Sequence, residues 1–333
     1  MCTPVHRRQS HTCKKMEQKI IDAIPVELLE AELTPERFLR TTNKGGNHIY
    51  VVDHKNAPNV MKEVGRLREI AFRTSGGGTG KDCDIDEFDT MDPPCRQLIV
   101  WDPEGRQILG GYRFIIGDDI KTDSNGRPRI ATAHMFDFSE KFLSTYMPHT
   151  IELGRSFVRV EYQSSRAGAK AIYALDNLWD GLGALTVLYP EIHYLFGKMT
   201  MYPSYPQKCR DMILYFLHKH FPDNEALITP INPLELQTPE DELAALFSGS
   251  TYAEDYKILN RMVRAEGCNI PPLVNAYMGL SPTMRTFGTA INDEFGDVEE
   301  TGIFISIPDI FDEKKDRHIN TFHQPADGNV RFW

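Results

Sequence analysis

The sequence predicts an α/β (α+β) fold in which helices flank a mixed, mostly antiparallel sheet. Its clearest element is a hairpin: residues 98–101 form one strand, residues 102–105 (DPEG) suit a type I turn, and residues 107–116 return. Strand and helix patterns then alternate between residues 150 and 221. An antiparallel pair followed by strand–helix units indicates a mixed sheet covered by helices. Hydrophobic residues make up 41% and charged residues 25% of the 333-residue chain, which excludes a disordered protein.

The segments before the hairpin read as an arm, a helix and a loop. Residues 1–18 are polar and basic and lack the apolar core of a signal peptide, so we expect a disordered basic arm and a cytoplasmic protein. Residues 20–33 are rich in apolar side chains, and residues 59–72 repeat theirs at helical spacing. The glycine-rich segment 75–81 does not match the spacing of a phosphate-binding P-loop, and we interpret it as a loop.

The elements after the hairpin follow from changes of hydrophobic period. We expect a short helix within 133–146, a strand at 150–160, a long helix at 166–189, a strand at 193–201 and a helix at 204–221. Further on we expect helices at 239–247, 252–263 and 273–278 and a strand at 302–307. These patterns divide the chain into the arm (1–18), a core (19–223) and a C-terminal extension packed on that core (224–333).

Charge and cysteine usage exclude several classes of protein. Forty-seven acidic and 37 basic residues give a net charge of −10, which argues against a nucleic-acid binder. No apolar run reaches the ~18 residues of a membrane span. The six cysteines form no CxxC pair, so we expect neither a metal site nor a disulfide scaffold.

Two groups of charged residues surround the hairpin. Four acids follow the glycine-rich loop: Asp84, Asp86, Glu87 and Asp89. Such a run is usually a solvated surface, and the alternative is a site that attracts an ammonium group. Arg113 lies in the returning strand, close to two glycines that would let a ligand approach the backbone.

A third group, Glu152 and Arg155, stands in an otherwise apolar strand. Strict alternation would place residues three apart on opposite faces. A bulge at Gly154 would turn both side chains to one face. Because burying charge costs several kcal/mol, this pair indicates a function.

The order of these residues resembles a known family. Arg68-x-x-x-Phe72, Asp86-x-x-Asp89, the hairpin arginine and Glu152-x-x-Arg155 are similar to the pattern of acyl-homoserine-lactone synthases and of the amino-acid N-acyltransferases that begin ornithine- and glycine-lipid synthesis. The second branch is closer, because LFG at 195–197, YP at 205–206 and the segment 270–288 resemble its C-terminal half. The resemblance covers about residues 60–310 and implies the GNAT fold.

The resemblance implies transfer of a (3-hydroxy)acyl chain from acyl carrier protein to the α-amine of an amino acid, with glycine favoured over ornithine. Glu152 would accept the amine's proton, directly or through water. Arg113 or Arg155, with Arg68 third, would clamp the acceptor carboxylate. Phe72 would also contact substrate, and Asp86 and Asp89 would either hold the amine or order the loop.

The donor site is expected at the start of the long helix. Residues 163–171 (QSSRAGAKA) lack the (Q/R)xxGx(G/A) loop of enzymes that use coenzyme A. Carrier-bound phosphopantetheine has a single phosphate, which backbone N–H groups at a helix start can bind. The residues predicted to contact the carrier or its phosphopantetheine are Arg159, Ser164, Ser165, Arg166 and Lys170.

Acyl-phosphopantetheine on the carrier is thus the expected co-substrate, and no bound cofactor or metal is expected. A separate O-acyltransferase would act downstream, and a peripheral contact with the inner face of the membrane is left open. Two alternatives remain at this point: an autoinducer synthase of the acyl-homoserine-lactone type, and a non-catalytic module that binds carrier protein.

Overall fold

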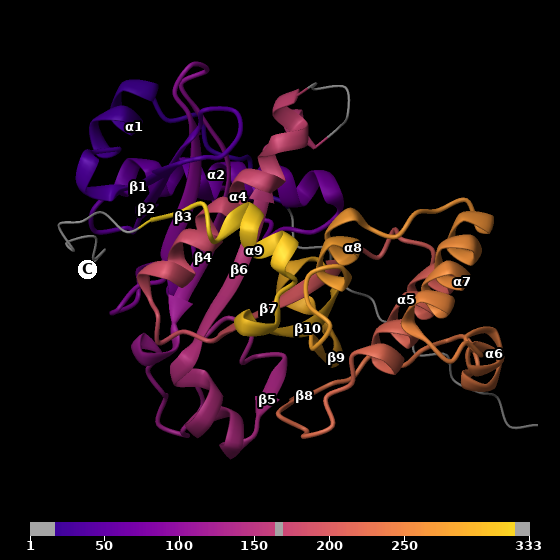
Figure 1. Ribbon diagram of the computed structural model, residues 1–333. Coiled ribbons are helices and arrows are strands. Elements are labelled where there is room, and N and C mark those ends of the chain that lie inside the picture. The colour runs from indigo at the N-terminus through magenta and orange to yellow at the C-terminus, as the bar shows by residue number, and fades with distance from the viewer. Residues whose placement is uncertain (1–16, 164–168, 324–333) are drawn as a thin grey trace, which may run out of the picture.

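One eight-stranded sheet forms the centre of the molecule in the computed structural model, which describes residues 17–163 and 169–323 (Figure 1). Its strands are β1 (Phe38–Thr41), β2 (His48–Val52), β3 (Arg96–Asp102), β4 (Gln107–Ile116), β6 (Thr150–Val158), β7 (Tyr194–Met201), β9 (Arg285–Asn292) and β10 (Val298–Ser306). They lie in the order β1-β2-β3-β4-β6-β7-β10-β9. Every neighbouring pair is antiparallel except β6–β7, so the predicted mixed, mostly antiparallel sheet is confirmed. A small second sheet pairs β5 (Phe136–Phe138) with β8 (Ile228–Pro230).

Helices cover both faces of this sheet. The α-helices of the described residues are α1 (Val26–Glu32), α2 (Pro58–Ser75), α3 (Glu87–Thr90), α4 (Ala169–Leu188), α5 (Gln207–His220), α6 (Glu240–Leu246), α7 (Tyr252–Ala265), α8 (Pro272–Met278) and α9 (Asp312–His318), of which α7 packs on α5. Strand β3 shows the layering: Leu98 and Val100 belong to the core that includes α4, whereas Ile99 and Trp101 belong to the core that includes α2. Because neighbouring residues of a strand point to opposite faces, α2 and α4 lie on opposite sides of the sheet.

Local sequence signals explain where α2 begins and ends. Pro58 occupies its first turn, where the missing N–H costs nothing, and Gly76 caps its end with a left-handed φ of 94°. The hairpin is also locally encoded, since Asp102 Oδ1 accepts hydrogen bonds from the N–H groups of Glu104 (3.1 Å) and Gly105 (2.9 Å). Both elements therefore occur where the sequence predicts them.

Strands β6 and β7 pair over a short distance and then separate. Their parallel ladder joins Thr150–Glu152 to Tyr194–Phe196 and stops there, although both strands continue. On its other edge β6 has a register shift against β4, and Arg155 within it has a φ of 50°. The predicted bulge is therefore present, with the left-handed residue at Arg155 and not at Gly154. The divergence leaves a gap in the middle of the sheet.

Some predicted elements differ from the structure. Within 133–146 the chain forms β5 and then a π-helical turn, Phe142–Tyr146, in place of a simple short helix. The strands β1, β2 and β9 had no sequence prediction. The segment after residue 223 does more than pack on the core, because β10 pairs with β7 and β9 pairs with β10 inside the main sheet. The sheet is thus continuous across the predicted boundary at 223/224.

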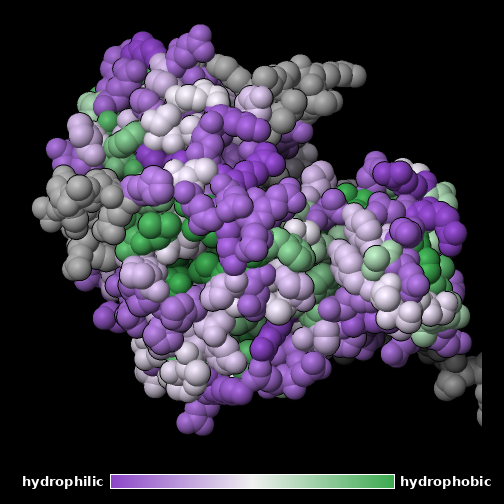
Figure 2. Space-filling view, viewed as in Figure 1, coloured by the Kyte–Doolittle hydropathy of each residue, from purple (hydrophilic) through white to green (hydrophobic). Residues whose placement is uncertain are grey.

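The face of the molecule in Figure 2 is mostly hydrophilic, with smaller hydrophobic areas. The large apolar side chains that are most exposed, Leu28, Ile231, Tyr252, Ile291 and Phe311, come from separate segments of the chain. Within residues 17–163 and 169–323, none of the helices has the length and apolar character that crossing a membrane requires.

Candidate active site

A cavity of about 390 Å³ lies where β6 and β7 separate. Leu153–Ser156 of β6 form one wall, and β7, β10 and α8 contribute much of the remainder, together with single residues of α2, β4 and α4. Most of the lining is apolar or aromatic, and includes Tyr112, Leu153, Trp179, Leu195, Met201, Tyr277, Ile303 and Ile305. Three charged side chains also line it: Arg155, Lys198 and Glu300. An apolar cavity of this size with a few polar groups is typical of a small-molecule site.

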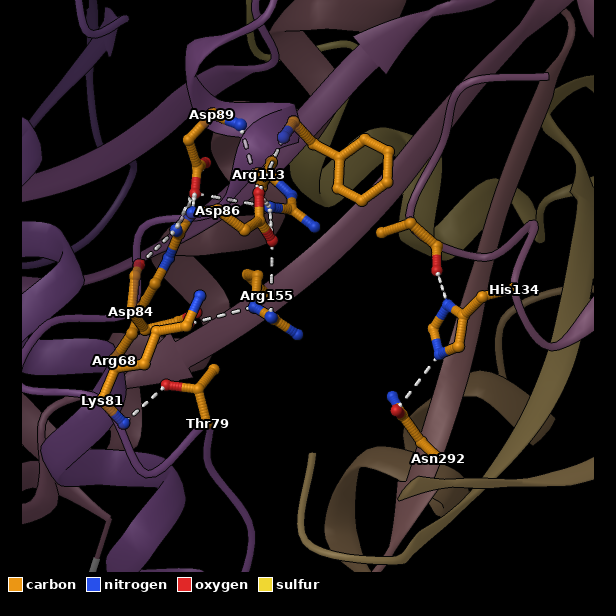
Figure 3. A network of polar contacts seen from close by, with 12 residues as sticks. Arg68, Thr79, Lys81, Asp84, Asp86, Asp89, Arg113, His134, Arg155 and Asn292 are labelled. Carbon is orange, nitrogen blue, oxygen red and sulfur yellow. Dashed lines mark hydrogen bonds and ion pairs between the residues drawn. The ribbon is translucent and has the colours of Figure 1, made fainter. Parts of the chain in front are cut away.

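Arg155 connects this cavity to a buried network of charges (Figure 3). Its Nε lies 3.0 Å from Asp84 Oδ2 and its Nη2 lies 3.5 Å from Asp86 Oδ2. The guanidinium also lies over the Phe295 ring, 4.4 Å from its centroid. With 13% of its side chain exposed, Arg155 is held by carboxylates and an aromatic ring, and it also lines the cavity.

Two further arginines lie deeper in the network. Arg113 Nη1 lies 2.7 Å from Asp86 Oδ2, and Arg68 Nη1 lies 3.3 Å from Asp89 Oδ2. Arg68 and Asp89 are fully buried, and Arg113 is 1% exposed. Three arginines thus balance three aspartates. Of the arginines predicted to clamp a substrate carboxylate, only Arg155 lines the cavity.

The aspartates order the loop that follows α2. Asp86 caps α3: its side chain accepts from the N–H of Phe88 and Asp89, and Asp89 accepts from the N–H of Asp86. Burial opposes ionisation of Asp86, but Arg113 and Arg155 outweigh this effect and hold its pKa below the usual range. Burial raises the pKa of Asp84, and Arg155 opposes that shift. These contacts favour loop ordering, the second of the two roles predicted for these acids.

Glu152 is not among the residues that line the cavity. It is 2% exposed and stands opposite Ile115 of β4 and Phe196 of β7. Burial raises the pKa of its carboxyl, and the charges of Arg113 and Lys198 partly counter that rise. Of the other predicted contacts, Phe72 does line the cavity, and its ring packs edge-on against Phe295 at 5.0 Å.

The sequence interpretation missed Lys198 and Glu300. They come from the neighbouring strands β7 and β10 and form an ion pair, with 9% and 3% of their side chains exposed. Thr200 Oγ1 donates to Glu300 Oε1 at 3.4 Å. The sequence contains a sign of both residues, because Lys198 and Glu300 each stand in a strand of otherwise mostly apolar residues, as Glu152 does.

The predicted donor residues are only partly covered by the structure. Arg159 follows β6 and pairs with Glu161 at 3.2 Å. Ser164, Ser165 and Arg166 lie outside the described residues. Lys170 belongs to the first turn of α4, and its side chain lies outside the description.

Removing Asp89 should unfold the protein more readily than removing any surface acid. Asp89→Ala removes the carboxylate that pairs with the buried guanidinium of Arg68 and lies 3.4 Å from that of Arg113, and losing one member of a buried ion pair costs about 3–5 kcal/mol. Urea unfolding followed by circular dichroism measures this loss. Asp92→Ala is the control, because Asp92 is 85% exposed in its pair with Lys55. Equal unfolding midpoints for the two variants would contradict the structural role of Asp89.

Comparison with known proteins finds a GNAT domain and amino-acid N-acyltransferases. Residues 67–172 match the family model described as an acetyltransferase (GNAT) domain. The chain is 63% identical over 305 residues to a glycine N(alpha)-acyltransferase of Bacteroides thetaiotaomicron, covering 92% of this chain and 90% of the relative. A glycine N(alpha)-acyltransferase of Phocaeicola vulgatus is 62% identical over 305 residues, with 92% and 94% covered. An L-ornithine N(alpha)-acyltransferase of Brucella abortus is 28% identical over 237 residues, with 68% and 70% covered.

Proposed function

Because the chain belongs to the glycine N(alpha)-acyltransferase family and is an acyltransferase with a GNAT domain, we propose that it moves an acyl chain from acyl carrier protein to the α-amine of glycine. The observation that carries this proposal is an apolar cavity with Arg155 in its wall, at the point where two strands of the sheet separate. The identity to amino-acid N-acyltransferases favours this activity over an autoinducer synthase and over a non-catalytic module.

Arg155 is the proposed clamp for the acceptor carboxylate. A guanidinium can donate two parallel hydrogen bonds to a carboxylate, and Asp84, Asp86 and Phe295 fix its orientation before the acceptor arrives. The carboxylate of a small amino acid held there would leave its amine in the gap between β6 and β7. This geometry supports an α-amino acid as the acceptor.

The same gap suits a thioester. The apolar lining can hold the acyl chain. Beyond Glu152 and Phe196, the backbone groups of β6 and β7 that face each other have no partner in a shared ladder. Their N–H groups are candidates to bind the thioester oxygen and the negative charge that develops on it during attack.

Glu152 is the proposed general base. An ammonium ion has no lone pair, so the acceptor must lose a proton before it attacks the thioester. Since Glu152 does not line the cavity, the proton would reach it through water. Burial raises the pKa of Glu152, which makes it a better proton acceptor near neutral pH. The C–N bond forms and the C–S bond breaks, and the second proton lost by the nitrogen protonates the departing thiolate, so the phosphopantetheine leaves as a thiol.

Salt should weaken the use of the donor if it is acyl carrier protein. Carrier proteins are acidic, and Arg159 at the end of β6 would supply positive charge in a chain of net charge −10. The Debye length falls from ~10 Å at 0.1 M salt to ~3 Å at 1 M, so we expect KM for the acyl carrier protein to rise over this range. Equal turnover with acyl-coenzyme A at equal concentration, or an unchanged KM, would exclude the carrier as the preferred donor.

The direct test is product analysis. Purified protein with 3-hydroxyacyl carrier protein, S-adenosylmethionine and equimolar glycine and ornithine should give mainly N-acyl-glycine by mass spectrometry. Mainly N-acyl-ornithine would refute the acceptor and keep the N-acyltransferase activity, and an acyl lactone formed from S-adenosylmethionine would favour the autoinducer synthase. A separate O-acyltransferase would use the product in aminoacyl-lipid synthesis. A cytoplasmic location, with or without peripheral contact at the membrane, stays a prediction.

A further inference from the structure

We propose that Lys198 selects against amino acids with a cationic side chain, because it already neutralises the carboxylate that such a side chain would need. This inference rests on the proposed N-acylation of glycine. It concerns why an acceptor such as ornithine, which differs from glycine by a three-carbon ammonium side chain, is used less well. The residues involved are Lys198 and Glu300, which the resemblance stated above does not include.

The described cavity lining carries more positively than negatively charged side chains. Among the described residues that line the cavity, Glu300 is the single carboxylate, whereas Arg155 and Lys198 are both cationic. In the ladder between β7 and β10, Lys198 stands opposite Gly302, and Glu300 stands opposite Thr200. Glu300 and Lys198 are therefore diagonal neighbours on one face of the sheet, and their ion pair is almost fully buried.

This arrangement suits glycine. Its carboxylate has Arg155 as a partner, and no side-chain charge remains to be satisfied. Because Lys198 already pairs with Glu300, the described lining offers no free carboxylate to stabilise the ammonium form of the bound amine over the neutral form that attacks the thioester.

The same arrangement penalises ornithine. Its δ-ammonium would leave water for a cavity in which the single carboxylate of the described lining is already paired. A buried cation without a partner is costly, and sharing Glu300 would bring two ammonium groups together. Charge, and not the length of the side chain, should therefore exclude ornithine.

The unmodified protein provides the first test. Norvaline has the three-carbon side chain of ornithine without the δ-amine, so it separates size from charge. In competition assays with acyl carrier protein, we expect norvaline to be acylated about tenfold to a hundredfold more efficiently than ornithine, the weight of one hydrogen bond to a charged group. If norvaline and ornithine are rejected equally, size explains the selectivity and the inference is wrong.

Lys198→Met provides the second test. It removes the ammonium with little change in volume and leaves Glu300 free to bind the δ-ammonium of ornithine. We expect the ratio of N-acyl-ornithine to N-acyl-glycine to rise about tenfold to a hundredfold. A folded variant that keeps the wild-type ratio, or that loses activity toward both acceptors, would overturn the inference.

The matched control is Lys198→Met combined with Glu300→Gln. It removes the same ammonium but leaves no carboxylate for ornithine, so the product ratio should stay low. A ratio as high as that of Lys198→Met alone would contradict the role of Glu300. Failure of the proposed function is distinguishable from these outcomes, because the wild-type protein would then form no N-acyl-glycine at all. If Lys198→Met does not fold, the comparison of norvaline with ornithine on the unmodified protein still tests whether charge or size excludes ornithine.

Discussion

Glu152→Gln should lower kcat by about 10²–10⁴-fold, the usual contribution of a general base. Glutamine has nearly the same shape as glutamate and cannot accept the proton of the acceptor ammonium. Because Glu152 does not line the cavity, KM for glycine and for the acyl donor should change much less than kcat. Steady-state assays of the purified variant measure both constants. A kcat within about threefold of wild type would exclude Glu152 from proton transfer.

The same variant should stay folded, and the sign of its stability change follows from the pKa. Burial raises the pKa of Glu152 in the folded protein above its unfolded value. Such a group stabilises the folded state at low pH, and that contribution is lost as the pH rises through the folded pKa. Glutamine is neutral at every pH, so Glu152→Gln should be at least as stable as wild type at neutral and alkaline pH. Urea unfolding at acidic and alkaline pH tests this separately from activity.

Glu299→Gln is the matched control for that experiment. Glu299 is also a largely buried acid in a strand of the main sheet, but it pairs with Arg210 of α5 at 2.5 Å. It follows from strand alternation that its side chain points away from the face that carries Glu300. The kcat of the Glu299→Gln variant should remain near that of wild type. A comparable fall in kcat for Glu299→Gln would show that any lost charge in the sheet impairs the enzyme.

Local signals account for the parts of the fold that were predicted. The hairpin β3–β4 and the helix α2 depend on turn residues, caps and periodicity that lie within a few positions of each other. The pairing of β10 with β7 does not, since it joins residues such as Thr301 and Met199 across about a hundred positions. No local pattern predicts which strand fills that place, and β1, β2 and β9 likewise depend on their neighbours for pairing.

In the candidate site, too, some features follow from local sequence and others do not. Motif order brought Arg68, Arg113 and Arg155 together as candidates, and all three belong to one charge network. Arg155 reaches the cavity at the register shift in β6, where its backbone is left-handed; the sequence predicts a bulge from Gly154 but not the backbone conformation of Arg155. Lys198 differs from these residues, because it is a buried charge in a mostly apolar strand, as Glu152 is, and that pattern is visible in the sequence alone.

Arg155→Lys should raise KM for glycine by about tenfold to a hundredfold, the weight of one or two hydrogen bonds between charged groups. Lysine keeps a positive charge beside Asp84 and Asp86, so the buried network retains its balance. It loses the planar fork that can bind a carboxylate while also holding Asp84. The left-handed φ of 50° is equally unfavourable for both side chains, so the substitution adds no backbone strain.

Glycinamide shows whether the lost contact is the one to the carboxylate. It has the amine of glycine and no carboxylate, so wild type should use glycine with a higher kcat/KM than glycinamide, and Arg155→Lys should reduce that preference about tenfold. Arg159→Lys is the control, because Arg159 pairs with Glu161 outside the cavity lining and should leave the preference unchanged. If Arg155→Lys slows both acceptors equally, the arginine positions the loop or the thioester, and another group binds the carboxylate. A preference that falls only in Arg155→Lys would assign the acceptor carboxylate to this guanidinium.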